Sequence, residues 1–184
     1  PNAGGKTIEM GSSYAEWRSL YYTVSAHYSY KSRYTIGFDM RVDGTTKFGP
    51  DKRWGCFPAV NTRWNMIDEN FMETLRDRAK VSMLSARFAI GRSGHAPRKD
   101  YLYTSEYGNE AQYLGYSAKK PIRMQLNTLK WEIVNSMNLG FDLGFLNDRI
   151  TSSFEVYRSK TSDMLMDNYR IPSENGFSSL TTTN

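Results

Sequence analysis

The chain of 184 residues has little of the chemistry that most enzymes use. It contains one cysteine, Cys56, and two histidines, His27 and His95. A single cysteine excludes an internal disulfide and a cysteine-based zinc site. The two histidines lack partners at metal-ligand spacing, and no Gly-rich phosphate loop or nucleophile motif occurs. We therefore expect no enzyme, and neither a cofactor nor a metal.

Long hydrophobic runs and clustered charges are also missing. No stretch of about eighteen apolar residues is present, so the sequence predicts no transmembrane helix. A membrane protein is still allowed, because transmembrane strands alternate apolar and polar residues and escape such a search. The net charge of +5 is dispersed, without a run of Lys and Arg. Nucleic acid is therefore not an expected partner.

What the sequence does have is aromatic side chains in strict alternation. Hydrophobic residues make up only 39% of the chain, but aromatics reach 14%. This balance is typical of a sheet with one wet face and one aromatic-rich face. A period of two predicts β-strands, and the chain is expected to be all-β. The expected strands cover residues 20–30, 34–43, 57–66, 83–91, 129–145 and 150–157.

The longest predicted hairpin covers residues 129–157. From Leu129 to Phe145 nearly every second residue is large and apolar, and Asn147–Arg149 supplies a tight turn. The first strand is far longer than the usual five or six residues. Its apolar face needs a cover, and we expect lipid against the side chains of Leu139, Phe141, Leu143 and Phe145.

The connections alternate in length. Residues 31–33 and 147–149 are tight turns, whereas the links at 43–56, at 92–128 and after 161 are long. A break with one helical turn at 67–80 falls on the side of the short turns. Outer-membrane barrels have short periplasmic turns and long extracellular loops. The pattern predicts an antiparallel meander that forms part of a large transmembrane β-barrel. Near the short turns we expect an aromatic girdle of Tyr22, Tyr28, Tyr30, Tyr34 and Trp64.

Several segments resemble a known family. The stretch Tyr28–Tyr34, YSYKSRY, resembles the YSYKDRY of SusC/RagA-type TonB-dependent outer-membrane transporters of Bacteroidetes. Residues 41–49 are similar to their R-x-DGSSRFG segment, residues 53–58 to RWGxFP, and residues 129–132 to LKWE. Residues 157–165 are similar to YxKxTxDLL. The matches keep the family's order and cover about 20–184. Ser85, Ala86 and His95 depart from the pattern.

The resemblance implies a part of a larger machine. Family members are barrels of about 22 strands with an N-terminal plug and a TonB box. They import oligosaccharides or peptides, are energised by the TonB complex, and work with a SusD-like surface lipoprotein as a lid. Residues 1–184 would then be a partial barrel domain of about six strands, without the plug and the barrel ends. It would lie in the lipid of a Gram-negative outer membrane and serve nutrient uptake.

Two groups of residues are candidates for a functional site. The first group would face the barrel lumen, where it forms a salt-bridge network that holds wall and plug, or else guides substrate: Asp39, Arg41, Asp43, Arg63, Arg87, Lys130, Glu132 and Asp142. The second group lies in the long loop at 92–128 and would stack on sugar rings, or else pack against neighbouring loops or the lid: Tyr101, Tyr103, Tyr107, Tyr113 and Tyr116.

Two other functions stay open on the sequence alone. One is a soluble, secreted β-rich carbohydrate-binding or adhesion module, in which a second sheet would cover the apolar face. The other is a static diffusion porin, which would have no plug domain.

Overall fold

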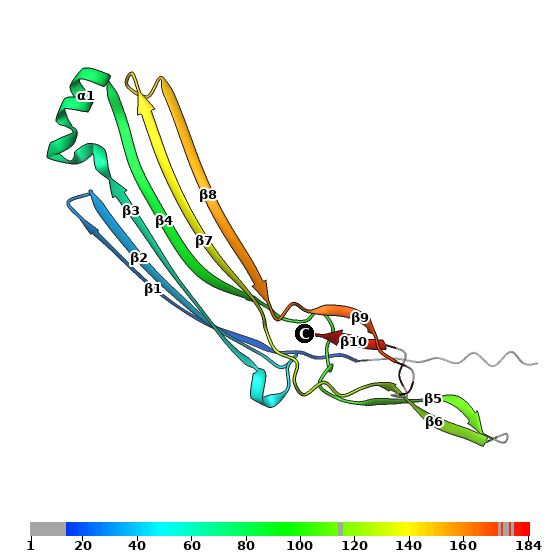
Figure 1. Cartoon of the computed structure of the whole chain (residues 1–184). Helices are drawn as coiled ribbons and strands as arrows, with labels where there is room; N and C mark the ends of the chain where they lie inside the picture. The colour runs from blue at the N-terminus through cyan, green and yellow to red at the C-terminus, as the bar shows by residue number, and fades with distance from the viewer. Residues whose placement is uncertain (1–13, 114–115, 173, 175–176, 178) are drawn as a thin grey trace, which may run out of the picture.

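The computed structural model describes residues 14–113, 116–172, 174, 177 and 179–184. Its main feature is one antiparallel sheet of six strands in the order β1-β2-β3-β4-β7-β8 (Figure 1). This all-β meander confirms the predicted fold class. The strands are β1 Ser19–Tyr30, β2 Tyr34–Thr45, β3 Trp54–Asn65, β4 Val81–His95, β7 Glu132–Phe145 and β8 Ile150–Ser162.

Two small sheets and four short helices complete the described chain. Strands β5 (Glu106–Tyr113) and β6 (Tyr116–Arg123) form a hairpin, and β9 (Met166–Arg170) pairs with β10 (Ser179–Thr183). The helices are η1 Pro50–Lys52, η2 Met66–Asp68, η3 Asn70–Met72 and α1 Glu73–Ala79. Within the described part of the chain, no helix is long and apolar enough to cross a membrane.

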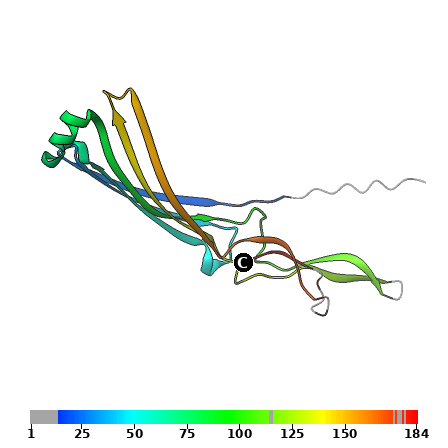
Figure 2. The same cartoon turned by 45° about the horizontal axis from the view of Figure 1, so that its top comes forward.

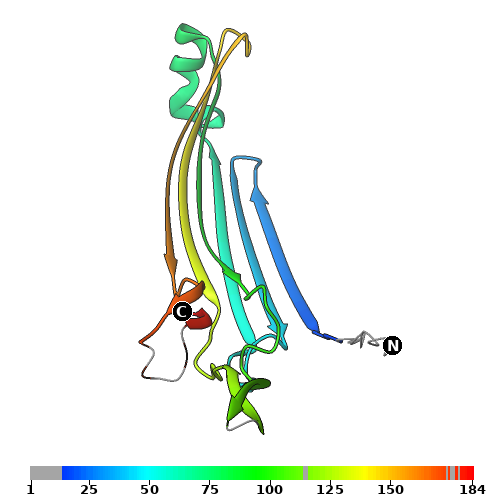
Figure 3. The same ribbon diagram turned by 90° about the vertical axis from the view of Figure 1, so that its right-hand side faces the viewer.

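The six strands lie side by side as a single curved layer. Figure 2 shows the layer bending along the strands, and Figure 3 shows the strands side by side from another direction. The short turns and α1 lie at one end, and the β5–β6 and β9–β10 hairpins lie at the other. Among the described residues, no second sheet covers either face of the six strands. Tight and long connections therefore segregate to opposite ends, as the sequence predicts.

The two tight hairpins are closed by residues in the left-handed region. Lys31 and Ser32 have φ of 49° and 57°, and Leu146, Asn147 and Asp148 have φ of 56°, 56° and 62°. Positive φ at successive turn residues matches the right-handed twist of the flanking strands. These turns set the registers, which pair Tyr30 with Tyr34 and Phe145 with Ile150.

The registers divide the sheet into two faces of opposite character. One face, here called the apolar face, carries Val24, Phe38, Val60, Phe88, Leu139 and Phe154. The other, here called the polar face, carries every carboxylate of the six strands: Asp39, Asp43, Glu132, Asp142 and Glu155. Phe154 is 61% exposed and Val24 is 58% exposed, so the apolar face is open in this chain.

The strand ends are staggered across the sheet. One row of paired residues runs from Tyr30 on β1 through Tyr34, Trp64, Ala86 and Phe141 to Phe154 on β8. Strand β1 ends at this row, but β8 continues beyond it to Ile150. A progressive offset of this kind is what tilted barrel strands require, since their ends must reach one height.

The structure corrects the start of the longest strand. Strand β7 begins at Glu132 and not at Leu129. Leu129 and Trp131 are 2% and 8% exposed, and both belong to a small apolar cluster at the loop end of the sheet. Their alternation with the strand residues is a coincidence of spacing, because burial against the loops also selects large apolar side chains.

This loop-end cluster is the main core of the chain. It consists of Phe48, Phe57, Leu102, Leu126, Leu129 and Trp131. The Trp131 ring lies with its centroid 4.9 Å from that of Phe48 and 5.4 Å from that of Phe57. The cluster joins the strand ends to the long connections, so these connections are anchored to the sheet.

Two further expectations are corrected. The connection at 92–128 is not a plain loop, because β4 continues to His95 and the β5–β6 hairpin follows. Tyr22 lies opposite Val42, near the loop end of β1, and so does not belong to the girdle at the short turns.

Candidate functional site

Seven of the eight predicted wall residues share the polar face or its strand phase. Asp39, Arg41 and Asp43 alternate along β2. Arg63 lies on β3 and pairs with Thr35, which has the same phase on β2. The others are Arg87, Asp142 and Glu132, which follow the same phase on β4 and β7. Lys130 precedes β7, and its Nζ pairs with Asp163 Oδ1 at 2.7 Å, just beyond β8. It is therefore part of the loop end and not of the strand.

The best-defined polar contact links Arg87, Asp142 and Ser153 across three strands. Arg87 Nε lies 2.9 Å from Asp142 Oδ2, and its Nη2 donates to Oδ1 at 3.1 Å. Ser153 donates from Oγ to Asp142 Oδ1 at 2.8 Å, and Ser85 donates to Oδ2 at 3.2 Å. Charge-assisted bonds of this kind are stronger than neutral ones. The arrangement cross-braces β4, β7 and β8.

A second polar contact lies toward the loop end of β2. Arg41 Nε donates to Asp43 Oδ1 at 2.6 Å, and its guanidinium lies 5.1 Å from the centroid of the Tyr21 ring. Asp43 is only 3% exposed, so the pair shields its carboxylate from water. Farther along the same face, Asn61 Nδ2 donates to Asp39 Oδ2 at 3.2 Å.

Arg63 is the exception on this face. It lies directly opposite Arg87, which is already paired with Asp142. Arg63 Nε donates to Asn65 Oδ1 at 3.1 Å, and the described residues offer it no carboxylate. A polar hollow of about 330 Å³ adjoins it, lined also by Asn61, Asn138 and Glu155. Glu155 accepts a hydrogen bond from Asn138 Nδ2. The hollow therefore presents one cation, Arg63, and one carboxylate, Glu155, that form no ion pair with a described residue.

Glu132 lies at the loop end, opposite His95. Its Oε2 accepts a hydrogen bond from the Leu165 backbone N–H at 2.9 Å. This carboxylate therefore fixes the segment that follows β8, which is a structural role.

At the short-turn end, Glu69 accepts hydrogen bonds from two of the girdle residues, Tyr34 and Trp64. Its Oε1 accepts hydrogen bonds from the Tyr34 hydroxyl and from Trp64 Nε1, the latter at 3.3 Å, and its Oε2 lies 3.5 Å from Arg33 Nη1. The Tyr34 and Trp64 rings stack with centroids 6.2 Å apart. The hydrogen bond from Tyr34, helped by Trp64 and Arg33, lowers the pKa of Glu69. Apart from the girdle tyrosines, no pattern in the sequence indicates this contact.

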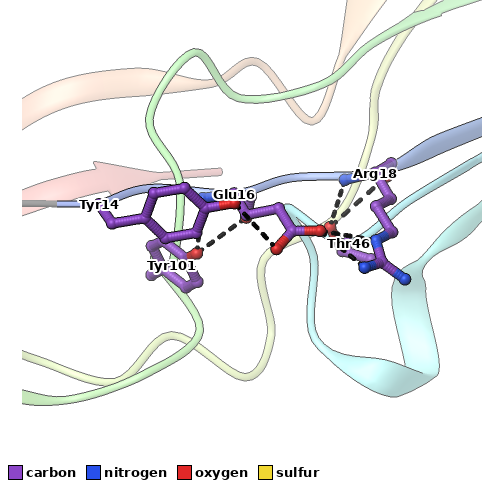
Figure 4. Close-up of polar contacts among 5 residues, drawn as sticks. All are labelled: Tyr14, Glu16, Arg18, Thr46 and Tyr101. Carbon is purple, nitrogen blue, oxygen red and sulfur yellow. Dashed lines mark hydrogen bonds and ion pairs between the residues drawn. The ribbon is translucent and has the colours of Figure 1, made fainter.

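Tyr101 has a defined role, which is to hold the segment before β1. Its hydroxyl donates to the Glu16 carbonyl at 2.8 Å and accepts from the Glu16 N–H at 2.9 Å (Figure 4). Arg18 Nε donates to Glu16 Oε1 at 2.8 Å, and this hydrogen bond lowers the pKa of Glu16. The Arg18 N–H in turn donates to Thr46 Oγ1 at 2.9 Å.

The other predicted loop tyrosines do not gather around Tyr101. Tyr103 is half-buried beside Gly49. Tyr107 and Tyr116 are 63% and 79% exposed on the β5–β6 hairpin. The backbone of Tyr113 pairs with Tyr116 at the tip of that hairpin. The five residues therefore divide into a structural pair near the sheet and a second group on the projecting hairpin.

The described residues contain no group of His, Cys, Asp and Glu side chains that would hold a metal ion. The polar groups on the sheet form ion pairs and hydrogen bonds suited to a rigid wall. Comparison with known proteins identifies what kind of wall this is. A family model described as "TonB dependent receptor-like, beta-barrel" matches residues 6–184.

The chain belongs to the TonB-dependent receptor β-barrel family.

Curated relatives narrow the family. The chain is 37% identical to the TonB-dependent receptor SusC of Bacteroides thetaiotaomicron over 169 residues, and this match covers 86% of the chain and 16% of SusC. It is 33% identical to TonB-dependent receptor P39 of Formosa agariphila over 162 residues, with 88% of the chain and 15% of that protein covered. The SusC/RagA resemblance is thereby confirmed.

Solved structures show the same fold. The RagAB peptide importer in its closed-closed state superposes with a TM-score of 0.80 at 22% identity, over 92% of this chain and 18% of that one. A second structure of the RagAB peptide transporter gives 0.78 at 21% identity, with 91% and 18% covered. The chain thus spans less than a fifth of the length of these relatives.

Family membership decides three points. The six strands are a section of an outer-membrane β-barrel, so the sheet is open here because it is one part of a closed wall. TonB-dependent receptors are transporters, which confirms that the chain is not an enzyme. A soluble module and a static porin both disagree with this membership.

Proposed function

We propose that this chain is a wall section of an energised outer-membrane nutrient importer, with its polar face toward the lumen and its apolar face toward lipid. The observation that carries this orientation is the segregation of charge: every carboxylate of the six strands lies on the polar face. A charged side chain at the bilayer midplane costs about 2–4 kcal/mol if it is Arg or Lys, and less if it is Asp or Glu. The face that carries Asp39, Arg87 and Asp142 therefore belongs to the lumen.

The dimensions of the apolar face support the same orientation. The rings of Tyr22 and Trp54 stack with centroids 6.3 Å apart at the loop end, as Tyr34 and Trp64 do at the other end. A rise of about 3.3 Å per residue places Trp54 and Trp64 about 33 Å apart along β3. At a strand tilt of about 40° this distance projects to about 25 Å, which is the height of the apolar band between the aromatic girdles of outer-membrane barrels.

Within this wall, the polar contacts hold the strands in place and receive the plug. The Arg87–Asp142–Ser153 contact is satisfied within the wall, whereas Arg63 and Glu155 are hydrogen-bonded to Asn65 and Asn138 but form no ion pair with a described residue. Both can therefore meet charged groups from outside the described chain. The exposed tyrosines of the β5–β6 hairpin, Tyr107 and Tyr116, are the candidates for contact with substrate or lid.

The partners and substrates belong to the same proposal. One relative is named SusC and the solved neighbours are peptide importers. By this kinship, the whole protein takes up an oligosaccharide or a peptide, is energised through the TonB complex, and works with a SusD-like lipoprotein. Co-purification of the full-length protein from its own membranes would test the partner. Recovery of the barrel without a stoichiometric lipoprotein would contradict this part of the proposal.

The orientation is tested by spin labels on the full-length protein in lipid nanodiscs. We expect a label at Leu139→Cys to be accessible to oxygen dissolved in lipid, and a label at Asn138→Cys to be accessible to a water-soluble nickel reagent. These neighbours occupy opposite faces of β7 and are matched in depth. Reversed accessibilities would contradict the orientation.

A further inference from the structure

The apolar face carries charge at one place only. Of the strand residues on that face, three are charged, and all three are cations near the loop ends of β4 and β8: Arg92, Arg158 and Lys160. Asn135 of β7 lies opposite both Arg92 and Lys160, and Met137 lies opposite Arg158. The three cations lie on β4 and β8, on either side of β7, and so form one cluster. Figure 1 shows these three strands side by side.

The cluster has no anion to balance it within the described chain. Arg92 Nε donates to Asn135 Oδ1 at 3.1 Å, but none of the three side chains forms an ion pair with a described residue. All three are exposed. Cations on a membrane-facing surface are costly unless they reach water or a counter-charge, so these three side chains must reach water or an external anion.

A hollow of about 450 Å³ lies next to the cations. Its lining includes the apolar Val60, Ile90 and Met137, which share one row of paired residues with Arg158. It also includes Arg92 and Lys160, which lie two residues farther toward the loop end. An apolar floor with a cationic rim fits a molecule that has a hydrocarbon part and an anionic head. A water-soluble anion would use only the rim.

The stagger of the strands places the cluster at the membrane boundary. The row of residues through Ser25 on β1 reaches Ser159 on β8. Strand β8 extends farther than β1 toward the short turns. The strands are therefore tilted, and the β8 residue at the same height in the membrane as Ser25 lies closer to the short turns than Ser159 does. The same offset brings the level of Tyr22, in the loop-end aromatic pair, close to that of Arg158. The cations therefore lie where lipid head groups meet the barrel.

We propose that Arg92, Arg158 and Lys160 bind the phosphate of a phosphorylated lipid in the outward-facing leaflet, with its acyl chains over Val60, Ile90 and Met137. Guanidinium groups match phosphate oxygens with paired donors, and a lysine adds a compact charge. This inference rests on the proposed orientation of the apolar face toward lipid.

The test uses the full-length transporter in detergent and native mass spectrometry. The probes are lipid A that carries its phosphates, the same lipid after enzymatic dephosphorylation, and inorganic phosphate as a competitor. We expect the wild-type protein to retain phosphorylated lipid A at least tenfold better than the dephosphorylated form. The triple variant Arg92→Gln, Arg158→Gln, Lys160→Gln should lose this preference.

Two control variants separate position from total charge. Lys52→Gln, Lys99→Gln, Arg149→Gln removes three exposed cations outside the cluster and should retain the lipid as the wild type does. Arg92→Lys, Arg158→Lys, Lys160→Arg keeps the charge and should retain most of the binding, which also shows that the site tolerates substitution.

Equal retention of both lipid forms by the wild type, or unchanged retention by the Gln triple variant, would overturn the proposal. Displacement by equimolar inorganic phosphate would overturn it as well, since the acyl chains would then play no part. A lipid-accessible label at Leu139→Cys together with any of these results shows that this inference fails while the orientation of the wall stands.

Discussion

At the residue scale, Gly94 shows how closely the loop-end cluster is packed. A Cβ atom at this position would lie 2.2 Å from two atoms of the Phe57 ring. Phe57 is 6% exposed and packs against Trp131, so the ring has little room to move. Gly94 is therefore a close-approach glycine.

We expect Gly94→Ala to lower the stability of the full-length barrel by about 1–3 kcal/mol, the usual cost of overpacking. Loss of heat resistance in SDS gel electrophoresis measures this. Gly49→Ala is the control, since the nearest atom there would be 3.7 Å from the new Cβ, and we expect a change within about 0.5 kcal/mol. Equal behaviour of the two variants would show that the Phe57 ring can yield.

Glu69 makes stability depend on pH at the short-turn end. The hydrogen bond from Tyr34, together with those of Trp64 and the charge of Arg33, lowers the pKa of Glu69 below its ordinary value of 4.5. A carboxyl whose pKa is lower in the folded state stabilises the fold fully above the unfolded pKa and loses this contribution as pH falls through the folded pKa.

We therefore expect wild-type protein to be more stable than Glu69→Gln above about pH 5, with the difference shrinking steadily below about pH 4.5. Unfolding midpoints in urea from pH 3 to pH 7 measure this. A difference that stays constant across the whole range would show that Glu69 acts through its shape and not through its charge.

At the scale of elements, the tight turn between β1 and β2 is strained. Ser32 adopts a φ of 57°, a conformation that costs a residue with a side chain roughly 1–2 kcal/mol and glycine almost nothing.

Ser32→Gly is expected to raise stability by about 1 kcal/mol, because it removes this cost and favours the hairpin turn. Unfolding midpoints of the full-length barrel provide the measurement. In contrast, Ser29→Gly within β1 should lower stability by about 0.5–1 kcal/mol, since glycine weakens a strand interior. A loss of stability in Ser32→Gly would mean that its hydroxyl, not its φ, matters at this turn.

The strands themselves were predictable because one physical rule produces them. Residues 20–30, 34–43 and 150–157 alternate strictly, and alternation follows directly from one face in lipid and one in water. This rule fails at Leu129 and Trp131. Their side chains are large and apolar because they pack in the loop-end cluster with Phe48 and Leu102, and not because they lie on a strand. No local pattern marks contacts between segments so far apart.

The wall residues divide in the same way. The shared face of Asp39, Arg41 and Asp43 follows from spacing alone. The partnership of Arg87 with Asp142 depends on the pairing of β4 with β7, which skips the intervening hairpin. The attachment of Tyr101 to Glu16 depends on an 85-residue separation and could not be foreseen.

At the scale of the whole molecule, the sheet has two free edges. Among the residues that the structure describes, strands β1 and β8 each pair on one side only, along their full lengths. In the closed barrel these edges meet neighbouring strands, and unpaired edges promote association between chains.

Residues 1–184 expressed alone and refolded in detergent should therefore form mixed oligomers, as six strands are fewer than the roughly eight that close a small barrel. Analytical ultracentrifugation over a range of protein concentrations would reveal this. A single monomeric species with native strand content would show that the edges are protected by some other device.

The loop-end cluster described above also separates two parts of the chain that tolerate substitution differently. On the side of the cluster that holds the six strands, each residue must suit the bilayer or the lumen and keep the strand pairing, so substitutions there are constrained. Beyond it, the β5–β6 hairpin makes its own ladder and can change in length or composition without disturbing any register of the wall. The hairpin can therefore be exchanged for another while the membrane-spanning wall is inherited unchanged.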